Sequence, residues 1–493
     1  MIREALPVRE HRPFRQATPE PSVHTGKLEL SVASYCAPGV APGSRFDTAP
    51  IGMSSMDKQQ IWDQVRSQAI ATPSIYGAVD FDAVPERFAG AAGDPNELRS
   101  ASEAERAQLL ADDGLMTLIR AYTFMGDRVA DPYAALMPEH GFKRLIDMVD
   151  QACKHGIDSV ADAPPELRTF IAAMETVPDW LDMAMVEEGA RLERAAMAIM
   201  SPIAIRAAFI ATFMNRYAAL PMALTGALSN ASAARRVKET ATFFATSVLP
   251  GALARGGDGF RAAAMVRLMH AMVRFNAMRK GRWDVSIYGV PIPQVDQMPA
   301  GLISVTMMAS DVLRQGRSEF TAEERARVEL SRYRCYLLGL PETLLATTPK
   351  EIVTLMAASL ATLRSGFDDD TCGNLLRATL GAYLPPDNSL TSRVFDRVEK
   401  GFSKVFFVKN YAGGDAARAA GMGVVPNALD KACYGIAATV TGSRLLAYRL
   451  AMNIPMLAGA VDRRLVAIIG KQLASWGHAH FTTDASAYRP SAP

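Results

Sequence analysis

The chain carries little charge and few cysteines, and each shortage excludes a class of protein. Only 21% of its 493 residues are charged, and 53 lysines and arginines nearly balance 51 aspartates and glutamates. A nucleic-acid binder driven by bulk charge needs a basic excess, and a highly charged disordered chain needs a larger imbalance, so neither is expected. The five cysteines are scattered without a CxxC pair, which argues against a disulfide framework or zinc knuckle and predicts reduced thiols.

The sequence also lacks the short motifs of several common enzyme classes. It contains no GxSxG, HExxH or paired ExxH motif, and no Walker or Rossmann fingerprint. Asp368-Asp369-Asp370 is similar to the aspartate-rich metal site of helical terpene synthases, but Cys372 occupies the fifth position, where that site has an acid. A polar helix start explains this run more simply. His478 and His480 form an HxH pair near the terminus, for which we expect no metal-binding role.

Strand-like alternation and long apolar runs are nearly absent. The best strand-like run is Val285 to Val290. The most apolar stretch, Ala195 to Leu228, is interrupted by Arg206 and Arg216, whereas a membrane span needs about 20 consecutive apolar residues. We therefore expect no transmembrane span and interpret the stretch as buried helices, with shallow membrane contact as the alternative.

Helical periodicity dominates what remains. The apolar spacing and the positions of proline and glycine predict helices over 55–70, 102–125, 142–154, 180–200, 203–228, 232–249, 258–279, 296–314, 322–339, 350–365, 371–383, 390–410, 430–451 and 457–477. The expected fold is all-α, a multi-helix single domain over 54–480 whose core covers about 180–385. A poorly ordered arm, 1–53, precedes it, and a polar tail, 481–493, follows it.

Helix-capping signals support these boundaries. Asn230 or Ser232 is the expected cap of the helix that leads into Arg235. Thr321 and Glu324 have the spacing of a capping box. The connection GALARGGDG at 251–259 is rich in glycine and can return one helix against the next.

One of the seven histidines, His270, lies within a long apolar helix, FRAAAMVRLMHAMVRFNAM. Arg267 and Arg274 share roughly one helix face with it, and Val266 and Val273 flank that face. A haem requires three kinds of group: an imidazole that binds the iron, aliphatic side chains that pack on the macrocycle, and guanidiniums that pair with the propionates. The alternative is a hydrogen-bonded core histidine on an amphipathic helix edged by arginines.

The preceding helix presents a polar group of its own. In ARRVKETATFF, Arg236, Glu239 and Thr240 fall at i, i+3 and i+4 and project from one side. If the two helices form a hairpin, this group faces His270 with room for a flat cofactor, where a cation, an acid and a hydroxyl suit O₂ binding. The alternative is an exposed charged patch.

Four segments together resemble a known family. They are RVKET at 236–240, VRLMHAMVR at 266–274, ISVTMM at 303–308 and YLLGLPETLLATTPKEIV at 336–353. The region of roughly 200–380 resembles the core of the haem oxygenases typified by bacterial latex clearing protein (rubber oxygenase). This family also includes the fungal oxygenase of mycophenolic acid biosynthesis.

The resemblance implies an iron-containing b-type haem in a globin-like, haem-enclosing helical core. His270 would be the proximal ligand, and Arg236 and Thr240 would lie on the distal helix. Latex clearing proteins carry a lysine directly before this threonine, where the present chain has Glu239. Lys238 is one position away, about 100° around the helix. The difference argues against rubber-type distal chemistry.

These observations predict a haem b-dependent oxygenase that uses O₂ to oxidise, and to cleave, a C=C bond of an apolar, isoprenoid-like substrate. Helices 203–228 and 296–314 are the expected substrate walls, and Thr306 is expected either to line them or to pack in the core. The basic N-terminus lacks a following apolar stretch, so a cytoplasmic protein is expected. The alternatives are a non-catalytic haem carrier or gas sensor and a cofactor-free helical interaction protein.

Overall fold

The computed structural model describes residues 55–477 except 100, 226–228, 280 and 282. Within these residues the regular structure is helical, and only two isolated bridges, Phe88–Leu363 and Asn96–Arg364, pair extended backbone. The all-α expectation is confirmed. The predicted arm 1–53, the tail 481–493 and the pair His478 and His480 lie outside the described residues.

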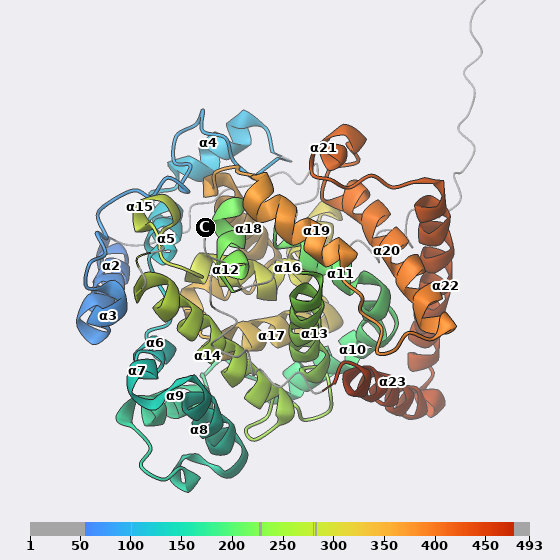
Figure 1. Ribbon diagram of the computed structural model, residues 1–493, viewed down its shortest axis with the longest axis horizontal. Helices are drawn as coiled ribbons and strands as arrows, with labels where there is room; N and C mark the ends of the chain where they lie inside the picture. Colours follow the sequence, from blue (N-terminus) through green and yellow to red (C-terminus); the bar gives the residue numbers. More distant parts are fainter. Residues whose placement is uncertain (1–54, 100, 226–228, 280, 282, 478–493) are drawn as a thin grey trace, which may run out of the picture.

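The elements follow in chain order (Figure 1). They are α2 Ser55–Ala71, α3 Pro73–Tyr76, α4 Glu103–Ala111, α5 Asp113–Thr123, α6 Ala130–Ala134, α7 Met137–His140, α8 Phe142–His155, η1 Ile157–Ser159, α9 Pro165–Glu175, α10 Met183–Ile199, α11 Ser201–Ala211, α12 Arg216–Leu224, α13 Asn230–Thr246, α14 Asp258–Arg279, α15 Val285–Tyr288, α16 Gln294–Arg314, α17 Ala322–Leu337, η2 Glu342–Leu344, α18 Pro349–Thr362, η3 Asp369–Gly373, α19 Asn374–Gly381, α20 Leu390–Asn410, α21 Ala416–Gly421, α22 Ala428–Met452 and α23 Pro455–Ser475.

Local capping chemistry explains where the helices depart from the predicted ranges. The predicted helix 102–125 is two helices, because the Asp112 carboxylate accepts from Leu115 N and starts α5. The predicted helix 203–228 breaks before α12, where Asn215 Oδ1 accepts from Tyr217 N. Helix α9 was not predicted, and it starts at Pro165, in a proline pair.

One other local expectation is wrong, and one is confirmed. The best strand-like run, Val285 to Val290, contains helix α15, which Asp284 caps and which ends before Gly289, in keeping with the scarcity of strand signals in the sequence. The cap of α13 is Ser229, in a capping box with Ser232, rather than Asn230 or Ser232 itself. The predicted box of Thr321 and Glu324 is present at the start of α17.

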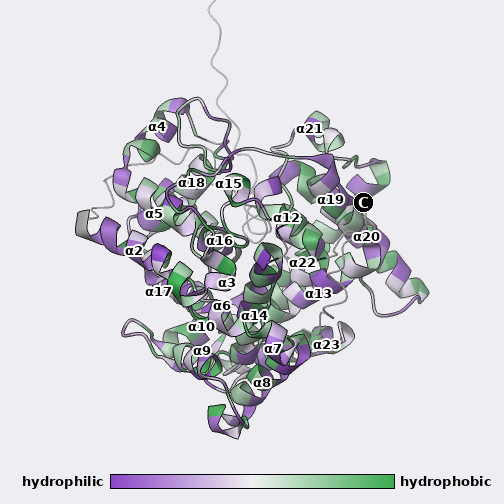
Figure 2. Ribbon diagram, turned by 60° about the vertical axis from the view of Figure 1, so that its left-hand side comes forward, coloured by the Kyte–Doolittle hydropathy of each residue, from purple (hydrophilic) through white to green (hydrophobic). Residues whose placement is uncertain are grey.

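Helix α14 runs through the middle of the molecule (Figure 1). The hairpin predicted from the glycine-rich connection is present in the structure, where α13 packs against α14. Most helices show both hydrophilic and hydrophobic residues in Figure 2, as expected when one face of each packs inward. The C-terminal helices α20, α22 and α23 gather on one side, where α20 packs on α11 and α23 packs on α10.

Among the described residues, no single helix has the length and apolar composition to cross a membrane. The pair α10 and α11 passes this test only together, and its axis bends by 97° between the two helices. Arg206 of this pair is fully buried, and its Nε donates to Glu399 Oε2 of α20 at 2.7 Å. This apolar stretch therefore packs inside the protein in the described structure.

Candidate haem-binding site

The middle of α14 has a single accessible stripe. From Ala262 to Phe275, every side chain is buried except those of Val266 and His270, which are half-buried. These two residues are four positions apart and therefore lie one above the other on one helix face. The structure thus presents His270 on the one open side of a core helix.

A chain of buried carboxamides holds the imidazole of His270. His270 Nδ1 lies 2.9 Å from Gln297 Oε1, and Gln297 Nε2 donates to Gln294 Oε1 at 3.2 Å. Gln294 Nε2 in turn donates to the carbonyl oxygen of Gly126 at 2.8 Å. Gln294 and Gln297 come from the first turn of α16 and are almost fully buried.

The direction of this chain determines the histidine tautomer. A backbone carbonyl only accepts, so Gln294 must present its amide N–H to Gly126 and its oxygen to Gln297. Gln297 must then present its own oxygen to His270, and the ring proton lies on Nδ1. The lone pair is therefore on Nε2, which has no hydrogen-bond partner among the described residues.

Electrostatics keeps this imidazole neutral. Burial lowers the pKa of His270 to about 4, and the positive charges of Arg274 and Arg236 act in the same direction, against the hydrogen bond that the ring donates to Gln297 and the negative charge of Asp127. A neutral imidazole with its Nδ1 proton engaged is the form in which histidine binds a metal ion. Helix α13, which carries Arg236, packs against α14, which carries His270.

Arg267 and Arg274, the predicted propionate partners, are both bound by carboxylates. Arg267 donates through Nε to Asp127 Oδ2 at 2.5 Å and through Nη2 to Asp127 Oδ1 at 3.0 Å. Arg274 is fully buried and pairs through Nη1 with Asp131 Oδ1. Both guanidiniums are therefore neutralised by the loop and short helix at 127–131, and their role toward propionates stays a prediction.

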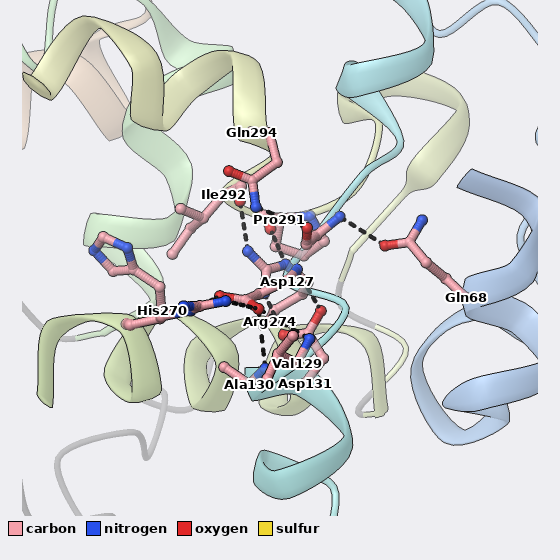
Figure 3. Close-up of polar contacts among 12 residues, drawn as sticks. Gln68, Asp127, Val129, Ala130, Asp131, His270, Arg274, Pro291, Ile292 and Gln294 are labelled. Carbon is pink, nitrogen blue, oxygen red and sulfur yellow. Dashed lines mark hydrogen bonds and ion pairs between the residues drawn. The ribbon is translucent and has the colours of Figure 1, made fainter. Parts of the chain in front are cut away.

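Arg274 also orders the segment that leads into α16. Its Nε donates to the carbonyl of Pro291 at 2.9 Å and its Nη2 to that of Ile292 at 2.6 Å. Figure 3 shows this guanidinium between Asp131 and the 291–292 backbone, with His270 one turn away on the same helix. Because only Pro293 separates this backbone from Gln294, Arg274 holds the segment from which the carboxamide chain starts.

Gly339, in the family-like segment 336–353, lies against the ion pair between Arg267 and Asp127. A Cβ at Gly339 would lie 2.5 Å from Asp127 Oδ2 and 2.7 Å from Arg267 Nε, and its φ of +88° is in the region that favours glycine. The LGLP sequence at 338–341 therefore passes directly against the ion pair between Asp127 and Arg267. Only glycine allows this approach.

On α13, the structure brings Arg236 and Glu239 together. Arg236 Nη1 lies 3.0 Å from Glu239 Oε2, and the glutamate is buried. Burial raises the pKa of Glu239, and the charge of Arg236 opposes that shift. Thr240, one turn beyond Arg236 on the same side, is exposed. The three predicted residues thus differ in environment, with Glu239 directed into the protein.

Lys238 faces a different part of the molecule. With Val237 and Ala241 it lines a cavity of about 330 Å³ that also involves Leu384 and Trp476. Burial lowers the pKa of this lysine. The expectation that Lys238 diverges from the Arg236 and Thr240 face is confirmed, since it lines this separate cavity.

The remaining candidates have structural roles. Asp368 caps the turn η3 by accepting from Thr371 N, and Asp369 pairs with Arg377 at 2.6 Å, as a polar helix start would. Thr306 is buried and donates to the carbonyl of Leu302 at 2.8 Å, which places it in the core. In the described part of the chain, no group of three or more His, Cys, Asp or Glu side chains could hold a metal ion.

Sequence reasoning missed the residues that support His270. Asp127 and Asp131 show an i, i+4 acidic spacing in GDRVAD, and Gln294 and Gln297 an i, i+3 spacing in PQVDQMP. Neither pattern is distinctive until the fold places it beside α14. Gly339 belongs to the family-like segment 336–353, and the sequence alone gives no physical reason for a glycine there.

Comparison with known proteins identifies a family for most of the chain. Residues 166–453 match the family described as ER-bound oxygenase mpaB/B'/Rubber oxygenase, catalytic domain. No curated protein matches the chain. The solved structure of latex clearing protein LCP in the closed state is 15% identical with a TM-score of 0.47, over 71% of this chain and 91% of that one.

Proposed function

The chain belongs to the family of ER-bound mpaB/B' oxygenases and rubber oxygenases, and on this basis we propose that it is a haem b-dependent oxygenase. Membership makes it an oxidoreductase of the oxygenase class. The haem, the site residues and the substrate are parts of the proposal. The observation that carries it is the neutral imidazole of His270, accessible on one side, with Nδ1 held and Nε2 free of hydrogen-bond partners among the described residues.

The residues around His270 fit a haem. Nε2 is the donor atom for iron, and Val266, half-buried one turn earlier, offers apolar contact beside it. When bound, haem supplies the redox chemistry that activates O₂. The protein's own contribution is to keep the imidazole neutral, to fix its tautomer through Gln297 and to fix the helix through Arg267 and Arg274.

The α13 residues are proposed to shape the side on which O₂ and substrate bind. Glu239 neutralises Arg236 and restrains its guanidinium, while the exposed Thr240 offers a hydroxyl that can donate a hydrogen bond. A buried glutamate with a raised pKa can also hold a proton, so Glu239 is a candidate base.

An apolar substrate with a C=C bond, isoprenoid-like in character, is proposed on the resemblance of the 236–353 segments. Helices α11, α12 and α16 are the proposed walls, and half-buried methionines such as Met222, Met307 and Met308 give them an adaptable apolar surface. The cytoplasmic location expected from the sequence belongs to the same proposal, and cell fractionation tests it.

The first test is the absorption spectrum of the purified protein after expression with a supply of haem. A Soret band is expected for the wild type and should be lost in His270→Ala, because the iron ligand is removed. The matched control is His155→Ala, which removes an exposed histidine on α8 and should retain the band. Helical circular dichroism should be the same in all three proteins. A wild type without a Soret band would refute the proposal.

Catalysis is tested separately by O₂ consumption. Uptake by the haem-loaded protein should depend on an added isoprenoid alkene. Haem binding without alkene-stimulated uptake would favour the haem carrier or gas sensor, and the absence of both would favour the cofactor-free interaction protein.

A further inference from the structure

Helix α22 lies at the outer edge of the molecule, on the side formed by the C-terminal helices (Figure 1). Helices α20 and α23 pack against it. Large hydrophobic side chains nevertheless remain exposed along α22 and at the corner that leads into α23, each by at least 46%. They are Leu429, Ile436, Val440, Leu446, Leu450, Ile454, Met456 and Leu457.

The exposed residues of α22 form a continuous stripe. At about 100° per residue, Leu429, Ile436, Val440, Leu446 and Leu450 fall within an arc of about 120°. A stripe of this width on a helix of a globular protein usually faces the core. Helix α22 already has a buried side, which includes Ala437 and Leu445, so this stripe is a second apolar face without a partner in the described chain.

The exposed charged residues of α22 and α23 are all basic. Helices α22 and α23 carry six exposed basic residues, Lys431, Arg444, Arg449, Arg463, Arg464 and Lys471. Their only acidic residues are Asp430, which is fully buried and paired with Arg397, and Asp462, which is paired with Arg194. On α22, Arg444 lies beyond one edge of the stripe and Lys431 beyond the other.

We infer that the α22 surface, defined by these eight apolar and six basic residues, docks on the surface of an anionic lipid bilayer. A helix that lies in a membrane interface has this arrangement, with apolar side chains toward the acyl region and basic ones toward the headgroups. Anionic lipids attract each nearby basic residue. A second copy of the chain would instead bring two cationic faces together, which is unfavourable.

This inference is independent of haem and of the reaction, so it is tested by binding alone. The full-length protein is sedimented with vesicles of phosphatidylcholine, with and without phosphatidylglycerol. Binding is expected to the anionic vesicles, to weaken as salt is raised, and to be much weaker with phosphatidylcholine alone.

Two double variants separate the electrostatic contribution to vesicle binding from the apolar one. Arg444→Gln with Arg464→Gln should weaken binding to anionic vesicles roughly twentyfold, since each basic residue near the surface contributes to attraction. Ile436→Ser with Leu450→Ser should weaken it at least roughly tenfold. Because all four positions are exposed, the thermal unfolding midpoint should change little.

The matched controls change exposed residues on helices α2 and α8, which are distant from α22 in the sequence. Ile70→Ser removes an 87% exposed apolar side chain on α2, and Lys143→Gln removes an exposed cation on α8. Both controls should bind like the wild type. Equal loss in controls and α22 variants, or no preference for anionic vesicles, would overturn the inference. The inference would also be overturned if the wild type did not bind vesicles but formed a dimer in solution, and if the Ile436→Ser and Leu450→Ser changes dissociated that dimer.

Discussion

At the scale of single residues, the described structure assigns a task to Gln297 that no sequence pattern indicated. Its oxygen accepts from His270 Nδ1, and Gln294 and Gly126 fix the direction of that bond. Second-sphere acceptors of this kind orient a ligating histidine and raise its basicity. Gln297 therefore acts through His270 as a positioning residue in the proposed site.

This role predicts a change in the properties of the bound haem. Gln297→Met keeps the size of the side chain but removes the acceptor, so haem affinity should fall at least roughly tenfold and the iron reduction potential should rise. Gln297→Glu retains an acceptor and should shift the potential in the opposite direction. Haem titration and a potentiometric titration of the Soret band measure both effects. Unchanged potentials would show that Gln297 only packs beside the ring.

A second prediction at this scale concerns pH. His270 has a folded pKa of about 4, below its unfolded value of about 6.5, so between these pH values the unfolded chain binds more protons. The contribution of His270 to the free energy of unfolding should therefore be constant above pH 6.5. It should become less favourable as the pH drops toward 4, by about 3 kcal/mol in total.

Urea unfolding of haem-free wild type and His270→Gln across this range measures the effect. The variant should lose less stability on acidification than the wild type. Burial raises the pKa of Asp131 to about 6, and it titrates in both proteins, so the difference between them isolates the imidazole. Parallel pH profiles would show that His270 is not neutral in the folded protein.

At the scale of elements, α14 is attached to the 127–131 segment by two buried ion pairs, Arg267 with Asp127 and Arg274 with Asp131. Tyr76 of α3 also donates to Asp131, which brings a third element to the same carboxylate. Breaking such a pair leaves an uncompensated buried charge, whereas replacing both partners by apolar groups is far less costly.

Arg274→Met should accordingly destabilise the protein by about 3–5 kcal/mol, and the double variant Arg274→Met with Asp131→Leu should recover most of that loss. Urea unfolding measures both. Lys143→Ala, which breaks the exposed pair with Asp147 on α8, should cost no more than about 0.5 kcal/mol. If the double variant were as unstable as the single one, the carbonyl contacts of Arg274 would be the main contribution instead.

At the scale of the whole molecule, ion pairs and helix packing connect the helices at the α22 surface to helices near the proposed site. Arg194 of α10 pairs with Asp462 of α23 at 2.8 Å, and Arg206 of α11 binds Glu399 of α20. Helix α13, which carries Arg236, packs on both α11 and α23. Docking of this surface on a bilayer would therefore orient the site relative to an apolar phase without a separate anchoring domain among the described helices.

The sequence by itself determined the helical class, most helix ranges and the apolar helix that carries His270. Periodicity and capping are local properties, and α14 and α20 begin and end at the predicted residues. The hairpin of α13 and α14 could also be predicted, because its connection is rich in glycine.

Only the tertiary structure decided what surrounds that histidine. Asp127, Asp131 and Gln297 are 27 to 143 positions from the α14 residues that they contact, so no local pattern relates them. It also decided that Arg267 and Arg274 face buried carboxylates, and that α22 has an apolar side left uncovered by the described chain. These outcomes depend on which elements meet, because burial and charge compensation arise between helices that are distant along the chain.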